Sequence, residues 1–196
     1  MSRPPQTWDS VHEPDDVDVG LATRIRAGDP AAFETLFRRM HPLLVAFAVN
    51  YVGDVARAEE IVQDLFADLW GVRQRWAVTG SVRAYLFSAT RHRALNVRRR
   101  DAVERDWADD EAHDAVRALH PAPITPDVRL ESSESQERLD AAIARLPERC
   151  RLVMQLRWRD ELSYAEIAEV MGISVKGVEV QLHRGLQALR KTLVRG

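Results

Sequence analysis

The chain has 196 residues, of which 45% are hydrophobic and 30% charged, so we expect one medium-sized or two small soluble domains. No apolar run approaches the length of a membrane span, and residues 1–20 lack the apolar core of a signal peptide, so we expect no membrane insertion and no export. A single cysteine, Cys150, excludes an internal disulfide and makes a cytoplasmic protein the expected class.

Charge is distributed unevenly, although the whole chain carries a formal net charge of only −2. Residues 72–100 contain eight arginines and no acidic residue, which gives a net charge of +8. Residues 101–140 carry a net charge of −8, and residues 141–196 carry +4. Two basic blocks on either side of an acidic one indicate two nucleic-acid-facing modules joined by a solvated connector.

The first part of the chain alternates helical patterns with helix-ending residues. Residues 1–18 are rich in proline and aspartate and are expected to be disordered. The Gly-Asp-Pro run at 28–30 predicts the end of one helix, a capping aspartate and a proline at the first position of the next helix. Pro42 is expected to separate that helix from an apolar helix over 43–52, which the Gly-Asp pair at 53–54 ends.

Residues 55–70 are predicted to form an amphipathic helix. Its apolar stripe consists of Ile61, Val62, Leu65, Phe66, Leu69 and Trp70. Its opposite face carries Glu59, Glu60, Gln63, Asp64 and Asp68. That face is either an ordinary solvated surface or an acidic surface for a basic protein partner, and periodicity alone favours the first interpretation.

Residues 71–81 are predicted to form a loop, followed by a basic helix over 81–100. Trp76 in the loop either packs onto the core or offers a ring on which an exposed base can stack. The buried or half-buried positions of the helix are expected to be Val82, Tyr85, Leu86, Ala89 and Leu95. Arginines interleaved with aromatic rings suit single-stranded nucleic acid better than duplex alone, because arginines follow phosphates while rings stack on bases.

The acidic stretch after residue 100 is expected to be a flexible linker over 101–135, with one weak helix near 106–119. A second helical unit over 136–196 follows, and Pro147 is predicted to begin a helix that runs to Trp158. The predicted fold class is therefore all-α, with two small helical domains joined by a flexible acidic linker.

Residues 162–193 have the pattern of two helices joined by a tight turn. Gly172 supplies the turn, Ser174 can cap the second helix, and the small Ala168 and apolar Val178 let the helices pack together. The second helix is expected to bury the stripe Val178, Leu182, Leu186, Leu189 and Leu193. A plain helical hairpin is the alternative, but the spacing and the polar outer face favour a DNA-binding helix-turn-helix at the C-terminus.

Five segments in order resemble a bacterial sigma factor of the extracytoplasmic-function type, the small two-domain branch of the sigma-70 family. They are GDPAAFETLF from residue 28, AEEIVQDLFADLW at 58–70, SVRAYLFSATRHRALNVRRR at 81–100, LPERCRLVMQLRWRDELSYAEIAEVMGIS at 146–174 and VKGVEVQLHRGLQALR from residue 175. The resemblance covers nearly all of residues 21–193, and the order of the segments is more specific than any single one.

The resemblance implies the role of each domain. Residues 19–100 would bind the β′ clamp of core RNA polymerase and would melt and read the −10 promoter element. Residues 136–196 would bind the β flap and read the −35 element as duplex DNA. The linker would run toward the RNA exit path. Many relatives are held inactive by an anti-sigma factor, which is a candidate third partner.

The resemblance also implies site residues. The polymerase-binding set is Glu59, Glu60, Gln63 and Asp64. The −10 DNA-binding set is Trp76, Arg83, Tyr85, Arg91, His92, Arg93, Asn96, Arg98, Arg99 and Arg100. Within it, Trp76, Tyr85, His92 and Asn96 would surround a flipped base, and Arg91, Arg93, Arg98, Arg99 and Arg100 would contact phosphates. The −35 DNA-binding set is Ser174, Lys176, Glu179, His183 and Arg184. No catalytic residue, metal site or cofactor is expected.

The chain departs from the family pattern at two places. His92 stands where relatives often have asparagine, so the −10 base that is read is open. Gly177 lies inside the recognition helix, where it lowers helix stability by up to about 1 kcal/mol relative to alanine.

Two other classes of function remain open. One is a stand-alone regulator that binds duplex DNA without polymerase. The other is an enzyme with a Cys150–His183 pair, although a buried core cysteine explains Cys150 better.

Overall fold

The computed structural model describes residues 16–78, 80–108 and 142–194, and all of the regular structure in these ranges is helical. The N-terminal unit consists of α1 (Asp16–Arg26), α2 (Pro30–Val52), α3 (Val55–Val72), a short 3₁₀ turn η1 (Arg73–Arg75) and α4 (Val82–Ala108). The C-terminal unit contains α6 (Glu148–Trp158), α7 (Tyr164–Met171) and α8 (Val175–Val194). The prediction of an all-α fold is confirmed.

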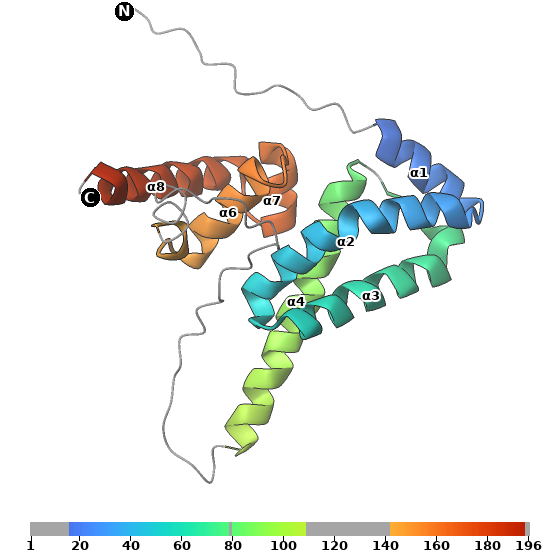
Figure 1. The fold of residues 1–196 in the computed structure, drawn as a ribbon, viewed down its shortest axis with the longest axis horizontal. Helices are drawn as coiled ribbons and strands as arrows, with labels where there is room; N and C mark the ends of the chain where they lie inside the picture. Colours follow the sequence, from blue (N-terminus) through green and yellow to red (C-terminus); the bar gives the residue numbers. More distant parts are fainter. Residues whose placement is uncertain (1–15, 79, 109–141, 195–196) are drawn as a thin grey trace, which may run out of the picture.

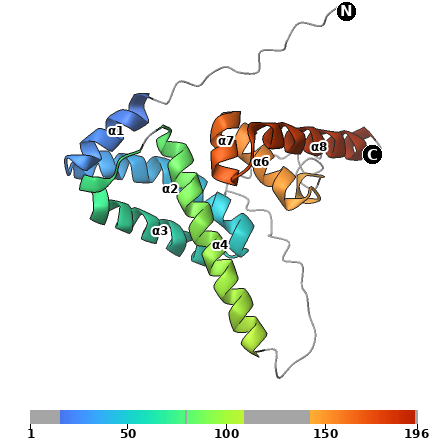
Figure 2. The ribbon, with the colours of Figure 1, turned by 180° about the vertical axis from the view of Figure 1, so that it is seen from behind.

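In the N-terminal unit, α3 and α4 pack against the long central helix α2, and α1 packs across the start of α2 (Figure 1). The core is rich in aromatic rings, and Phe47 of α2 meets Phe87 of α4 edge to face, with ring centroids 5.1 Å apart. Edge-to-face pairs of this kind stabilise a core beyond the area that they bury. The last turns of α4 extend past α2 and α3, as both views show (Figures 1 and 2).

Helix boundaries follow the local signals in the sequence. The Asp29 carboxylate accepts the backbone N–H groups of Ala31 and Ala32 at 2.9 and 3.2 Å, and Pro30 begins α2. Gly53 ends α2 with φ +72°, a left-handed conformation that glycine adopts without strain. The Asp54 carboxylate then caps α3 by accepting the N–H of Arg57 at 2.8 Å. These predicted boundaries are confirmed.

Three predictions on helix extent are wrong. Pro42 does not end a helix, because α2 runs through it with Met40 and Leu44 buried on one side and the proline exposed. The first helix begins at Asp16, inside the stretch expected to be disordered, because Asp18 is buried and pairs with Arg39 at 2.9 Å. At the other end of the unit, α4 continues eight residues into the expected linker, where no glycine or proline stops it.

The remaining residues of the expected N-terminal disordered segment and of the expected linker lie outside the described residues, as does most of the weak helix expected near 106–119. Where the described chain resumes, residues 142–144 are helical, and Pro147 precedes α6 as predicted.

The C-terminal unit buries a stripe of α8 that differs from the predicted one. Val178, Leu182 and Leu189 are buried, but Leu186 is 42% exposed and Gly185 takes its place against α6. A Cβ atom at Gly185 would overlap the sulfur of Met154 and lie 3.2 Å from its Cγ. The absence of a side chain at Gly185 therefore lets α8 approach α6 closely.

We expect the substitution Gly185→Ala to lower the free energy of unfolding by about 1 kcal/mol. Overpacking Met154 costs about 1–3 kcal/mol, and the better helix propensity of alanine offsets up to about 1 kcal/mol of it. The matched control is Gly71→Ala in α3, where a Cβ meets nothing within 4 Å and only the propensity gain remains. Urea unfolding followed by circular dichroism measures both, and equal stability of the two variants would contradict this packing.

Candidate nucleic-acid interface

The basic helix α4 starts at a defined cap and presents three differently used faces. The Ser81 hydroxyl accepts the N–H of Ala84 at 3.2 Å and fixes the first turn. His92, Asn96 and Arg99 follow one another at helical spacing and are all exposed. Arg99 donates to the Asn96 amide oxygen at 3.2 Å, and Arg100 is exposed beside them. This first face is a basic and amide-bearing strip that solvent reaches directly.

The second face of α4 lies toward α3. Arg93 forms an ion pair with Asp68 at 2.7 Å, and Arg57 of α3 pairs with Asp101 at 2.6 Å. Ion pairs between half-exposed groups contribute about 0–1 kcal/mol each, so their main effect is to orient the side chains. Of the predicted −10 set, Arg93 is therefore already engaged within its own unit.

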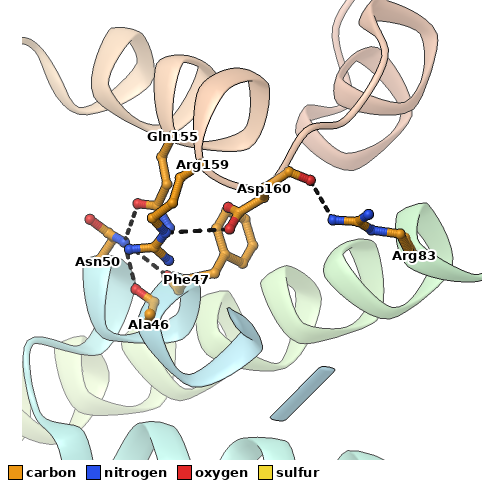
Figure 3. A network of polar contacts seen from close by, with 7 residues as sticks. All are labelled: Ala46, Phe47, Asn50, Arg83, Gln155, Arg159 and Asp160. Carbon is orange, nitrogen blue, oxygen red and sulfur yellow. Dashed lines mark hydrogen bonds and ion pairs between the residues drawn. The ribbon is translucent and has the colours of Figure 1, made fainter. Parts of the chain in front are cut away.

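The third face of α4 meets the C-terminal unit. Arg83 donates a hydrogen bond to the backbone carbonyl of Asp160 (Figure 3). Arg91 lies beside the turn between α7 and α8, with its Nη1 4.0 Å from where a Cβ would stand on Gly172. Arg98 pairs with Glu148 of α6 at 3.2 Å. Three arginines of the predicted −10 set are therefore in contact with the C-terminal unit.

Trp76 lies in the core rather than on the surface, with 4% of its area exposed. Its ring centroid is 6.0 Å from that of the half-buried Tyr85, and the two rings are tilted by 52°. The prediction that Trp76 stacks on a base does not fit this position, because the ring would have to leave the core. The turn η1 ends at Arg75, directly before Trp76. The packing of Trp76 onto the core is the other interpretation that the sequence allowed.

The four predicted polymerase-binding residues share one exposed surface. Glu59, Glu60, Gln63 and Asp64 all lie on the solvent side of α3. The opposite side of the same helix is buried through Ile61, Val62, Leu65, Phe66 and Leu69. An exposed acidic strip on a rigidly packed helix is suited to a basic protein partner.

The paired helices α7 and α8 have the predicted local geometry. Gly172 ends α7 with φ +64°, and the Ser174 hydroxyl accepts the N–H of Gly177 at 3.1 Å at the start of α8. Ser174, Lys176, Glu179, His183 and Arg184 are all exposed. A Cβ on Gly177 would lie 3.4 Å from Ile173 Cβ and Ser174 Oγ, so the glycine borders its own turn.

The pair of Cys150 and His183, imagined as a nucleophile and base, is not formed. Cys150 is 2% exposed, and its thiol donates to the Gln181 amide oxygen at 3.1 Å. Burial raises the pKa of the Cys150 thiol, which disfavours the thiolate. His183 lies on the outer face, where its Nε2 is 2.9 Å from Gln187. The predicted buried core cysteine is confirmed.

Several polar residues at the meeting of the two units were not singled out from the sequence. Asn50 of α2 donates to the Gln155 amide oxygen at 3.0 Å and also to the carbonyls of Ala46 and Phe47 (Figure 3). Asp160 is fully buried, and its carboxylate accepts from Arg159 at 3.4 Å. Burial raises the pKa of Asp160, while Arg159, Gln155 and Arg83 oppose the rise.

Glu166 joins the N-terminus of α7 to the N-terminus of α4. It accepts the N–H of Ser163 at 2.7 Å, and its own N–H donates to the Ser163 hydroxyl at 3.3 Å, which completes a capping box. Burial alone would raise the pKa of Glu166, but hydrogen bonds with Ser81 and Ser163 and the charge of Arg83 outweigh it and lower the pKa. The Ser-x-x-Glu spacing is the sequence signal that could have revealed this box.

No helix in the described ranges is long and apolar enough to cross a membrane. Within the same ranges, no three histidine, cysteine or acidic side chains gather closely enough to hold a metal ion.

Comparison with known proteins assigns the family. Residues 36–103 match the model for sigma-70 region 2, and residues 136–189 match that for sigma-70 region 4. The chain is 30% identical over 173 residues to the ECF RNA polymerase sigma factor SigL of Mycobacterium tuberculosis, an alignment that covers 85% of this chain and 92% of SigL. The chain belongs to the ECF sigma factors of the sigma-70 family.

The chain is also similar to other known proteins. This sigma factor is 24% identical over 174 residues to the ECF sigma factor SigW of Bacillus subtilis, covering 87% of this chain and 93% of SigW. Its fold resembles RpoE of Bartonella quintana, solved with the anti-sigma factor NepR, at a TM-score of 0.62, with 22% identity over 82% of this chain and 96% of RpoE. It also resembles CnrH, solved with the cytosolic domain of CnrY, at a TM-score of 0.60 and 23% identity. This alignment covers 92% of this chain and 99% of CnrH.

The capping box of the sigma factor is expected to make its stability depend on pH. Because the pKa of Glu166 is lowered in the folded protein, its ionised form adds stability that is present above the ordinary value of 4.5 and lost as the pH falls through the lowered value. Glu166→Gln should lower the free energy of unfolding by about 1 kcal/mol near neutral pH. The difference from the wild type should shrink below pH 4.5.

Urea unfolding at a series of pH values measures this effect. Glu169→Gln is the matched control, because Glu169 is exposed on the same helix and its replacement should change stability by less than about 0.5 kcal/mol. A loss of stability in Glu166→Gln that stays constant down to pH 3 would rule out the ionised carboxylate as its source.

Proposed function

We propose that this sigma factor binds core RNA polymerase and directs transcription initiation at promoters that it reads at two points. The observation that carries the proposal is that the described chain has three distinct exposed polar surfaces, which are divided between the two units that match the family models. The acidic surface of α3 and the basic surface of α4 lie in one unit, and the outer face of α8 lies in the other. A protein acting with RNA polymerase in this way would work in the cytoplasm.

The proposed −35 contact is the outer face of α8 in duplex DNA. The tight turn at Gly172 leaves the first turns of α8 exposed, which is the part of a recognition helix that reaches base edges in the major groove. Lys176, His183 and Arg184 supply hydrogen-bond donors for bases and phosphates, and Glu179 supplies an acceptor.

The proposed −10 contact is α4 on a melted strand. The exposed strip of His92, Asn96 and Arg99 combines amide, ring and guanidinium groups, which suit an unstacked base and its phosphates. Arg91 and Arg98 flank the strip on the face that meets the C-terminal unit.

Two protein partners complete the proposal. The acidic strip of Glu59, Glu60, Gln63 and Asp64 would contact the β′ clamp, and the C-terminal unit would contact the β flap. An anti-sigma factor is a further proposed partner, because RpoE of Bartonella quintana, which has a similar fold, was solved in complex with the anti-sigma factor NepR.

In vitro transcription with core RNA polymerase of the source bacterium tests the proposal. With fragments from upstream of genes as templates, adding the protein should produce transcripts whose start sites share two upstream sequence elements, and core alone should not produce them. Tight binding to duplex DNA in the absence of polymerase, with no new transcripts, would instead favour a stand-alone regulator.

The phosphate contacts of α4 predict a salt dependence. Replacing Arg99 and Arg100 together by alanine should reduce the slope of log affinity against log salt by about 1.4 for holoenzyme on a pre-melted promoter, since each phosphate contact to a single strand contributes roughly 0.7. Arg26→Ala with Arg38→Ala, both exposed and away from α4, is the charge-matched control. An unchanged slope in the α4 variant would remove Arg99 and Arg100 from the DNA path.

A further inference from the structure

Val180 lies on the outward face of α8, opposite the side that packs into the C-terminal unit. The helix packs against α6 and α7 through a buried stripe of Val178, Leu182, Gly185 and Leu189. Because a helix turns by about 100° per residue, Val180 points roughly opposite the middle of that stripe. Its exposed fraction is 39%. Among the α8 side chains described between positions 175 and 191, it is the one large apolar group that points straight outward.

Two other exposed apolar residues of α8 border its buried side. Val175 is 44% exposed and Leu186 is 42% exposed. Both lie within roughly 80° of the centre of the buried stripe, so they continue the core to its edge. The exposed residues one turn away from Val180 are polar instead, namely Lys176, His183 and Arg184. Val180 is therefore an apolar position inside a basic surface.

Helix stability does not account for a valine at this position. A β-branched side chain loses rotamer freedom in a helix, so valine is a poorer helix former than alanine or lysine. Because Val180 stays 39% exposed, it also gains only part of the stabilisation that burial provides. A partner that covers Val180 would remove the remaining apolar area from water.

The residues around Val180 leave it open to such a partner. Side chains on a helix lean toward its N-terminus, so Val180 lies over the turn that carries Gly177. Gly177 has no side chain that could cover the valine. One turn further along α8, Nε2 of His183 lies 2.9 Å from the amide nitrogen of Gln187. This contact ties the histidine ring to the turn that follows it, and Val180 remains exposed.

The major groove of DNA contains one apolar group that suits such a residue. Each base edge presents hydrogen-bond donors and acceptors there, and thymine adds its C5 methyl group. A valine side chain has no hydrogen-bonding group, so a donor or acceptor pressed against it would lose water without a replacement. The thymine methyl group gains from the same contact, because two apolar surfaces leave water together. Lys176 and Arg184 lie beside Val180 and can bind phosphates or purine edges.

We propose that Val180 is a specificity-determining residue of this sigma factor, and that it selects thymine at one position of the −35 element through contact with the C5 methyl group. This role depends on the −35 contact proposed above for the outer face of α8. Cytosine is rejected at that position because it lacks the methyl group and presents an amino donor on its major-groove edge.

The first experiment changes the DNA. Templates randomised over the −35 element of a promoter are transcribed by wild-type holoenzyme, and the templates that yield transcripts are sequenced. Each thymine that is preferred is then replaced by deoxyuridine, which keeps every hydrogen-bonding group and lacks only the methyl group. At one such position the initial rate of transcription at limiting holoenzyme should fall about fourfold, as expected for removing one methyl group from an apolar contact.

The second experiment changes the protein on the same pair of templates. Val180→Ala removes both methyl groups of the side chain, so transcription from the thymine template should fall about fourfold and the two templates should become equivalent. Val180→Thr keeps one methyl group and should retain part of the preference for thymine. Alanine is the better helix former, so Val180→Ala should keep its fold, which circular dichroism checks.

Leu186→Ala is the matched control, because Leu186 is an aliphatic residue of α8 with a similar exposed fraction of 42%. It lies beside the core rather than on the outward face, so its loss should leave the ratio of the rates on thymine and deoxyuridine templates as in the wild type. The same ratio in Val180→Ala as in the wild type would overturn the role of Val180. A −35 element without a preferred thymine, or equal wild-type rates on both templates, would overturn it as well.

The wild-type reaction separates this role from the function on which it depends. If wild-type holoenzyme initiates at promoters but replacing thymine and replacing Val180 have independent effects, only the role of Val180 fails. If the protein supports no promoter-dependent transcription at all, the proposed function fails, and thymine selection by Val180 fails with it.

Discussion

The hydrogen bond from Arg83 to the Asp160 carbonyl, with the placement of Arg91 against Gly172, is the constraint on which the rest of the structure depends. Together with the buried hydrophobic cluster that runs through both units, it holds the C-terminal unit against α4 and determines which surfaces remain accessible. Eight arginines between residues 72 and 100 give this region a strong positive field, which attracts phosphates and also favours any nearby carbonyl or carboxylate. In the structure, this face of α4 satisfies part of that field from within the chain, through the Asp160 carbonyl and the Glu148 carboxylate.

The parts of the fold that could be predicted from sequence are those decided within a few residues. The caps at Asp29, Asp54 and Ser174 and the turn at Gly172 depend on local backbone chemistry, which a short sequence window contains. The errors lie where tertiary packing overrides local preference. The chain passes through Pro42 because both halves of α2 bury the same face, and α8 buries Gly185 rather than Leu186 because α6 approaches closely.

The candidate surfaces were predictable to the extent that they are exposed faces of amphipathic helices. The residues predicted on α3 and α8 are exposed, as their helical period implies. Trp76 was ambiguous, because an aromatic residue in a basic loop has the same local pattern whether it packs inward or stacks on a base. The contact between the two units had no sequence signal, since Asn50 and Gln155 are 105 residues apart, Arg83 and Asp160 are 77 apart, and neither pair belongs to a periodic pattern.

Site-specific photocrosslinking from position 91 tests most directly whether the face of α4 that contacts the turn at Gly172 also contacts the melted promoter strand. A photoreactive residue replaces Arg91 in the full chain, and crosslinks are mapped in the free protein and in the open complex of holoenzyme with promoter. The account predicts crosslinks to the turn around Gly172 in the free protein, and to the melted strand at the −10 element in the open complex. A crosslink to the turn that persists undiminished in the open complex, with none to DNA, would contradict it.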